Sequence, residues 1–156
     1  MAELVIMRHA KSAWPAGVAD IERPLNERGR RDASAAGRWL REHKTLDLVV
    51  CSPALRTRQT WELVACELGT VPEVRYDERL YGTSTYAEVV RELPDDARTV
   101  LLVGHNPDVE DLAALLTGSP VRFKTATIAV LIGSGAWKDA GPGWATLETV
   151  VTPRGE

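Results

Sequence analysis

Three short apolar runs stand out in the hydrophobic pattern of the chain. They cover residues 4–7, 48–51 and 100–103, and every position in them is apolar. A strand with one solvated face alternates apolar and polar residues, whereas a strand covered on both faces does not. We therefore predict three strands of a mostly parallel sheet with helices on both faces.

Helical patterns fill the segments between and after these runs. In the first helix, Ala33, Ala36, Gly37 and Leu40 share one face. Asn26 can cap a first helix over about 27–44, and Gly69 can stop a second helix over about 54–68. A third helix is predicted over 86–93, and a fourth starts after Pro107, which suits the first helical turn.

The last third of the chain has a different pattern. Residues 127–132 and 145–151 are typical of β-strands, and a glycine-rich stretch joins them. They can form an antiparallel edge of the sheet. The predicted fold class is α/β, a three-layer α/β/α sandwich in a single domain over residues 1–156.

Composition and charge narrow the classes of partner. The 156 residues are 44% hydrophobic and carry a net charge of −3, which argues against nucleic acid and membrane surfaces as partners. Residues 8–58 are locally basic, with eleven Lys or Arg against six Asp or Glu. This imbalance suits a pocket for a small anion.

Several features point to a cytoplasmic protein. Cys51 and Cys66 are too few for a disulfide framework. The apolar run near the amino terminus is too short for a signal peptide, and no run is long enough to span a bilayer. We expect a soluble, cytoplasmic protein and take a monomer as the default.

Basic side chains follow all three apolar runs. Arg8 and His9 follow the first, Arg56 comes five residues after the second, and His105 follows the third. Ligands of open α/β sheets bind outside the carboxyl ends of the strands, so we expect these four side chains to meet. One such residue is usually structural, but four at equivalent positions indicate a site.

The residue types suit phosphoryl transfer. Guanidinium groups bind phosphate oxygens in a planar, bidentate way, and neutral imidazole is a nucleophile near pH 7. No cluster typical of a metal site accompanies them in the sequence. We therefore expect neither a metal nor another cofactor.

The motifs resemble those of the histidine phosphatase superfamily. Residues 7–14 (Met-Arg-His-Ala-Lys-Ser-Ala-Trp) resemble its Arg-His-Gly motif, residues 52–60 its second motif and residues 103–107 its third. Residues 23–29 resemble the stretch before its first long helix, and the match runs in order over about residues 4–117. The superfamily includes the cofactor-dependent phosphoglycerate mutases and the short SixA-type phosphohistidine phosphatases.

The resemblance implies a phosphoglycerate mutase-like fold and a role for each matching residue. It makes His9 the nucleophile that becomes phosphorylated, while Arg8, Arg56 and His105 bind the phosphoryl group. Glu78 lies in a segment that resembles the one carrying the mutase general acid. Lys11 and Ser12 are candidates for the rim of the substrate pocket.

Departures from the mutases bear on the substrate. Ala10 replaces the glycine of the first motif, and Pro15 stands where many mutases have asparagine. The chain also lacks the insertions that enclose the mutase substrate. An open site favours a SixA-type phosphatase acting on a phosphorylated (phosphohistidine) protein, with a small phosphorylated metabolite as the alternative substrate.

Two other functions remain to be weighed. A cysteine phosphatase would use Cys51 with Arg56, but only four residues separate them and Pro53 removes a backbone N–H from the loop. A non-catalytic phosphate-binding module would use the same basic pocket without turnover. P-loop and dinucleotide-binding motifs are absent from the sequence.

Overall fold

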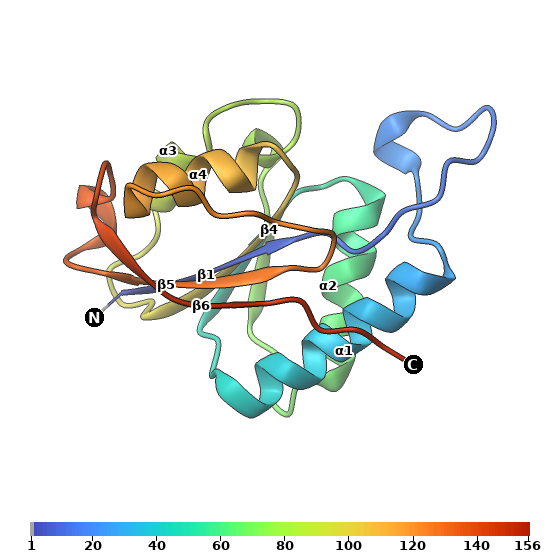
Figure 1. The fold of residues 1–156 in the computed structure, drawn as a ribbon, viewed down its shortest axis with the longest axis horizontal. Coiled ribbons are helices and arrows are strands. Elements are labelled where there is room, and N and C mark those ends of the chain that lie inside the picture. The colour runs from blue at the N-terminus through green and yellow to red at the C-terminus, as the bar shows by residue number, and fades with distance from the viewer. Residues whose placement is uncertain (1) are drawn as a thin grey trace.

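The computed structural model describes residues 2–156, and Met1 lies outside the described residues. A six-stranded sheet with the order β3-β2-β4-β1-β5-β6 forms the centre (Figure 1). The first four strands of that order are parallel, and β5 and β6 continue the sheet in antiparallel fashion. The strands are β1 (Glu3–Arg8), β2 (Leu48–Cys51), β3 (Glu73–Tyr76), β4 (Thr99–Gly104), β5 (Ile128–Gly133) and β6 (Ala145–Val151).

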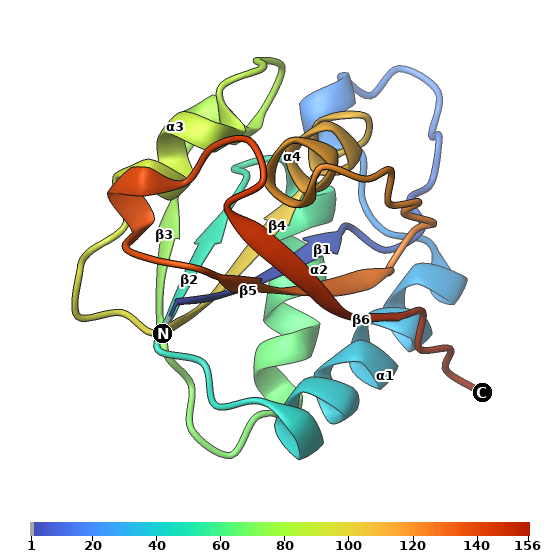
Figure 2. The same cartoon turned by 60° about the vertical axis from the view of Figure 1, so that its left-hand side comes forward.

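Helices cover both faces of the sheet, as Figures 1 and 2 show. One face carries α1 (Glu27–His43) and α2 (Leu55–Glu67), and the other carries α3 (Tyr86–Arg91) and α4 (Asp108–Thr117). This arrangement confirms the predicted α/β/α sandwich. Within residues 2–156, no helix has both the length and the apolar character that crossing a membrane demands.

The apolar runs form strands because both of their faces are buried. Along β1, Leu4 and Ile6 pack into the core under α3 and α4, whereas Val5 and Met7 pack into the core under α1 and α2. All four side chains are 0% exposed. Burying a side chain of this size stabilises the fold by about 1.5–3 kcal/mol, so neither face tolerates a polar residue.

The predicted starts of α1, α3 and α4 are confirmed, α2 starts one residue later than predicted, and the predicted ends differ by one or two residues. The Asn26 side chain caps α1 by accepting a hydrogen bond from the Gly29 N–H at 2.8 Å. Helix α2 ends at Glu67, two residues before Gly69. Gly37 lies where α1 crosses α2, and a Cβ atom there would come within 2.8 Å of the Val64 carbonyl oxygen. Glycine at this position therefore lets the two helices pack closely.

Strand β3 has no counterpart in the sequence prediction. It lies at the edge of the sheet, pairs with β2 in parallel, and is mostly exposed. Only Val74 contributes to the core, as a partly buried residue. Glu73, Val74, Arg75 and Tyr76 do alternate polar and apolar side chains, but over only four residues and without an apolar run, so this short strand signal was missed.

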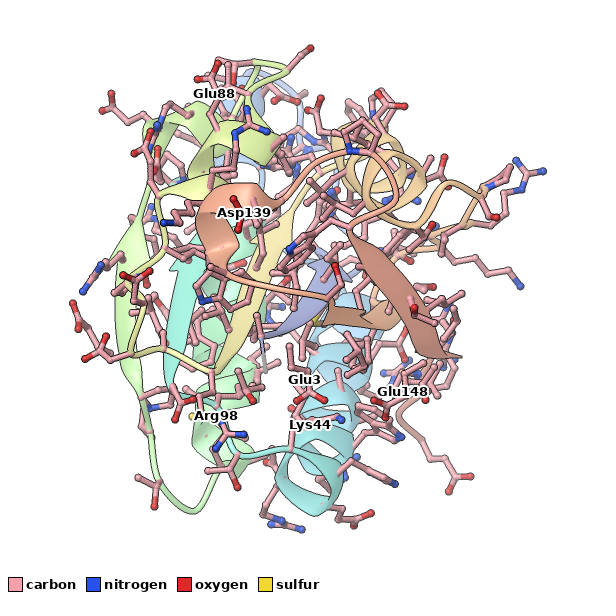
Figure 3. The ribbon with its side chains drawn as sticks, turned by 90° about the vertical axis from the view of Figure 1, so that its left-hand side faces the viewer. Glu3, Lys44, Glu88, Arg98, Asp139 and Glu148 are labelled. Carbon is pink, nitrogen blue, oxygen red and sulfur yellow. The ribbon has the colours of Figure 1, made fainter. Side chains whose placement is uncertain are left out.

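An ion-pair cluster links the carboxyl end of α1, where Lys44 lies, to β1 and β6 at the end of the sheet where β1 begins (Figure 3). The Lys44 ammonium lies 2.8 Å from the Glu3 carboxylate on β1 and 3.4 Å from Glu148 on β6. Burial lowers the pKa of Lys44, but the two carboxylates outweigh it and raise the pKa overall. The charged cluster is thus structural and lies far along the strands from the site described next.

Candidate active site

The predicted basic residues meet at the carboxyl ends of the parallel strands. Arg8 ends β1 and His9 follows it, His105 follows the last residue of β4, and Arg56 lies in the first turn of α2. They border a cavity of about 300 Å³. Its lining residues are Arg8, His9, Lys11, Ser12, Trp14, Arg23, Arg56, His105, Asn106 and Thr125.

The hydrogen bonding of His9 determines which ring nitrogen can react. His9 Nδ1 lies 2.7 Å from the carbonyl oxygen of Ala10, which can only accept a hydrogen bond. Nδ1 must therefore carry the proton when the ring is neutral, and Nε2 has the free lone pair. The backbone holds the residue in place, since the His9 N–H donates to the Gly104 carbonyl at 3.0 Å.

The surroundings of His9 keep the ring neutral. Burial lowers its pKa, the Ala10 carbonyl opposes this, and Arg56, Arg8 and Arg23 lower it further, to about 4 from the ordinary 6.5. A lowered pKa means that the reactive neutral form persists until the pH falls through that value. At neutral pH, His9 is therefore ready to act as a nucleophile.

We expect NMR titration of the free protein to show this shift directly. In histidine-labelled protein, the His9 ring signals should titrate near pH 4. For the same reason, kcat/KM should fall on the acid side only below about pH 5, after correction for titration of the substrate. A His9 midpoint near 6.5 would contradict this account of the site.

His105 lies beside His9, with ring centroids 5.3 Å apart. Its Nε2 contacts Ser52 Oγ at 2.8 Å, and that oxygen also accepts the Ala54 N–H at 3.3 Å. The Ser52 hydroxyl can then donate its proton to His105 Nε2. Because Nε2 accepts this hydrogen bond, the neutral His105 ring carries its own proton on Nδ1. Burial, together with the positive fields of His9 and Arg56, lowers the His105 pKa to about 3.

The arginines retain hydrogen-bonding capacity. Arg8 Nη1 donates to the Phe123 carbonyl at 3.0 Å, and both Nη atoms of Arg56 donate to Asp20. Among residues 2–156, the buried Nε atoms of Arg8 and Arg56 and Nδ1 of His105 have no partner. Buried donors are normally satisfied, so these atoms mark capacity for an anion.

Other residues of the second motif hold the His9 loop. The Thr60 hydroxyl accepts the Ala10 N–H at 3.1 Å and donates to the Arg56 carbonyl at 2.7 Å. The Gln59 side chain accepts the Leu25 N–H at 2.8 Å. One helical turn thus carries Arg56 and fixes the loop after His9, which explains why these residues occur together in the sequence.

Asp20 contacts the site, and the sequence patterns did not single it out. Its carboxylate lies 3.1 Å from Arg56 Nη2 and 3.0 Å from Arg23 Nη1, and it accepts the Tyr81 hydroxyl at 2.7 Å. The Tyr81 hydrogen bond, followed by those from Arg23 and Arg56, holds the Asp20 pKa well below its usual range. Asp20 is thus an ionised anchor for two arginines of the cavity.

Six of the seven predicted site residues line the cavity. Glu78 does not: it is exposed at the start of the 3₁₀ helix η2 (Glu78–Leu80) and is not a lining residue. Four lining residues were not predicted. Arg23, Trp14 and Asn106 fall inside the quoted motifs, which was a usable signal, whereas nothing in the sequence pointed to Thr125.

The cysteine alternative loses its support in the structure. Cys51 is 0% exposed and is not a lining residue of the cavity. Its thiol donates to the Ser52 carbonyl at 3.3 Å, and burial raises its pKa. A thiol in this state is a poor nucleophile. Over residues 2–156, His, Cys, Asp and Glu side chains form no group of three suited to a metal ion.

Comparison with known proteins connects the site to a family. Residues 4–96 match the model of the histidine phosphatase superfamily (branch 1). An uncharacterized protein of Mycobacterium tuberculosis is 43% identical, over 95% of this chain and 100% of its own length. An uncharacterized chloroplastic protein of Arabidopsis thaliana is 30% identical, over 96% of this chain and 77% of its own length.

Two solved structures share the whole architecture. A protein of Nakamurella multipartitia, assigned as the phosphohistidine phosphatase SixA, superposes with a TM-score of 0.87 at 38% identity, covering 97% of this chain and 96% of that one. The protein histidine phosphatase SixA complexed with tungstate superposes with a TM-score of 0.84 at 27% identity, covering 97% of each chain.

Proposed function

Because the chain belongs to the histidine phosphatase superfamily (branch 1) and is a phosphatase, we propose that it hydrolyses phosphohistidine in proteins, as a SixA-type enzyme, through a phosphoryl group carried on His9. The observation that carries the proposal is the lining of the cavity. Two histidines and three arginines surround it, and none of the lining residues that the structure describes is Asp or Glu.

In the first step, His9 Nε2 attacks phosphorus. The Nε2–P bond forms while the bond from phosphorus to the leaving group breaks, and the leaving group departs with the bonding electrons. Arg8, Arg56 and His105 stabilise the negative charge on the phosphoryl oxygens, which spreads as the transition state forms. Because Nδ1 of His9 donates to the Ala10 carbonyl, that carbonyl also stabilises the positive charge that develops on the ring.

In the second step, water attacks the phosphorylated His9. An O–P bond forms, the Nε2–P bond breaks, and the electron pair returns to Nε2. The products are inorganic phosphate and neutral His9, ready for another cycle. The same arginines serve both steps, since the charge on the phosphoryl oxygens is the same in each.

The lack of an acidic lining residue limits which leaving groups can depart, because no such residue can protonate them. Glu78 is exposed on η2, and the Asp20 carboxylate is held ionised by Tyr81 and two arginines. An alcohol leaves poorly unless an acid protonates it, whereas a phosphohistidine ring can take up a proton from solvent on its other nitrogen and leave as neutral imidazole. This favours phosphohistidine over a phosphate ester. Glu78 as general acid remains a proposal for ester substrates alone.

Similar proteins support the same substrate class. The SixA structure with tungstate is named as a protein histidine phosphatase. We extend that activity to this chain on the strength of the shared architecture. Metal independence, a single domain, a monomeric state and a cytoplasmic location remain predictions from the sequence.

A substrate panel tests the proposal. We expect kcat/KM for histidine-phosphorylated protein and free phosphohistidine to exceed that for sugar phosphates by at least about 100-fold, the lower range of what a general acid supplies to an ester. The rates should be unchanged by EDTA. Equal or faster hydrolysis of sugar phosphates would establish the phosphomonoesterase alternative, and binding without release of phosphate would establish the binding module.

A further inference from the structure

A projecting segment between β1 and α1 borders the cavity. We call residues 13–22 the arm; in Figure 1 it is the blue loop that stands away from the body beyond the end of β1. Its base is closed by an antiparallel bridge between Ser12 and Leu25 and by a hydrogen bond from the Ala13 N–H to the Pro24 carbonyl at 2.8 Å. The arm is thus a defined excursion from the fold.

The arm exposes apolar side chains to solvent. Residues 14–22 are nine consecutive exposed positions, and only Asp20 and Glu22 among them are charged. Trp14 is 77% exposed, Ile21 40% and Val18 38%. Single exposed apolar residues are ordinary, but a group of them in one segment is typical of an interaction surface.

The arm is held in position from within the site. Both the backbone carbonyl and the carboxylate of Asp20 accept hydrogen bonds from Arg56, at 2.8 and 3.1 Å. Tyr81 and Arg23 bind the same carboxylate. The apolar surface therefore has a fixed place relative to the arginine proposed to bind phosphate, and a partner would gain affinity without ordering a mobile loop.

Trp14 connects the arm to the cavity. It is a lining residue of the cavity, and the Arg23 guanidinium lies over its ring, 3.2 Å from the ring centroid. Tryptophan and arginine are the residue types most enriched at the energetic centres of protein interfaces. The arm and the cavity therefore share one side chain, that of Trp14.

We propose that the arm is a docking surface for the protein that carries the phosphohistidine, an inference that rests on the proposed function. A phosphoryl group in the cavity places the rest of its carrier at the mouth, where the arm begins. Apolar side chains that flank the phosphohistidine of such a carrier would pack on Trp14, Val18 and Ile21. Free phosphohistidine has no such neighbours and gains nothing from the arm.

The test compares two substrates with the same leaving group. Soluble extract of the source organism, phosphorylated on histidine with phosphoramidate, supplies the protein substrates, and free phosphohistidine is the small substrate. The double variant Val18→Ser/Ile21→Ser should hydrolyse the protein-bound phosphohistidine at least about tenfold more slowly than wild type, the scale of an interface hot spot. Its kcat/KM for free phosphohistidine should stay within about twofold, because neither residue lines the cavity.

Val71→Ser is the matched control, since Val71 is 58% exposed, of similar chemistry, and outside the arm. It should leave both rates unchanged. An unchanged rate on protein substrates in the double variant, or an equal loss on both substrates, would overturn the docking proposal. A dimeric wild type that the double variant converts to a monomer would assign the surface to a second copy of the chain instead. Failure of the wild type on both substrates would count against the proposed function itself.

Discussion

Replacing Arg56 by lysine should reduce kcat/KM by at least about tenfold, which corresponds to about 1.4 kcal/mol, although the positive charge is kept. The Arg56 guanidinium uses Nη1 and Nη2 to hold the carbonyl and the carboxylate of Asp20, and Nε remains as a further donor. A lysine ammonium is a single point charge and cannot reproduce this planar set. A hydrogen bond that involves a charged group contributes about 1.5–3 kcal/mol. If lysine loses two of the hydrogen bonds that the Arg56 guanidinium makes, the expected decrease in kcat/KM exceeds tenfold.

Arg58→Lys is the matched control for this prediction. Arg58 lies on the same helical turn, is exposed, and its Nε donates to the Pro53 carbonyl at 3.0 Å. Arg58 is not a lining residue of the cavity, so the kcat/KM of Arg58→Lys should remain at the wild-type level. Steady-state kinetics with free phosphohistidine measures both variants. A loss below about threefold in Arg56→Lys would show that a diffuse positive field suffices and that planar geometry does not matter.

The parts of the site that the sequence predicts are those fixed by the strands. Arg8, His9 and His105 are placed by the ends of β1 and β4, which pair in parallel along their whole length, from Glu3 with Thr99 to Arg8 with Gly104. Because that pairing aligns the two ends, an apolar run followed by a reactive residue is enough to predict their meeting. Arg56 follows from the same logic, since only three residues separate the end of β2 from the start of α2.

The parts that the sequence does not predict depend on loops. Asp20 contacts Arg56 through the path that the arm takes, and no local pattern in residues 13–22 predicts that path. Thr125 arrives from the segment before β5, which has no helical or strand signal. Glu78 shows the converse: the motif around it matches a family segment, but the side chain is exposed on η2 and is not a cavity-lining residue.

The largest effect should come from His9→Ala, which removes the atom that we propose forms the bond to phosphorus. Turnover should fall by at least about a thousandfold, because loss of a nucleophile removes the covalent route as a whole. His43→Ala is the matched control. His43 is the remaining histidine of the chain, exposed on α1 and bonded through Nδ1 to the Trp39 carbonyl, and its replacement should leave activity intact.

A trapping experiment identifies the intermediate independently of the rate. A phosphoryl group on imidazole nitrogen is a phosphoramidate, which is stable in base and labile in acid, the reverse of an acyl phosphate. Brief mixing with ³²P-labelled substrate and an alkaline quench should leave label on the protein, in the peptide that contains His9, and acid should remove it. His9→Ala should carry no label. His105→Ala should turn over slowly but still become labelled, since the role proposed for His105 is to stabilise the phosphoryl group without bonding to phosphorus. Label on Cys51, or normal turnover by His9→Ala, would exclude the mechanism proposed for this site.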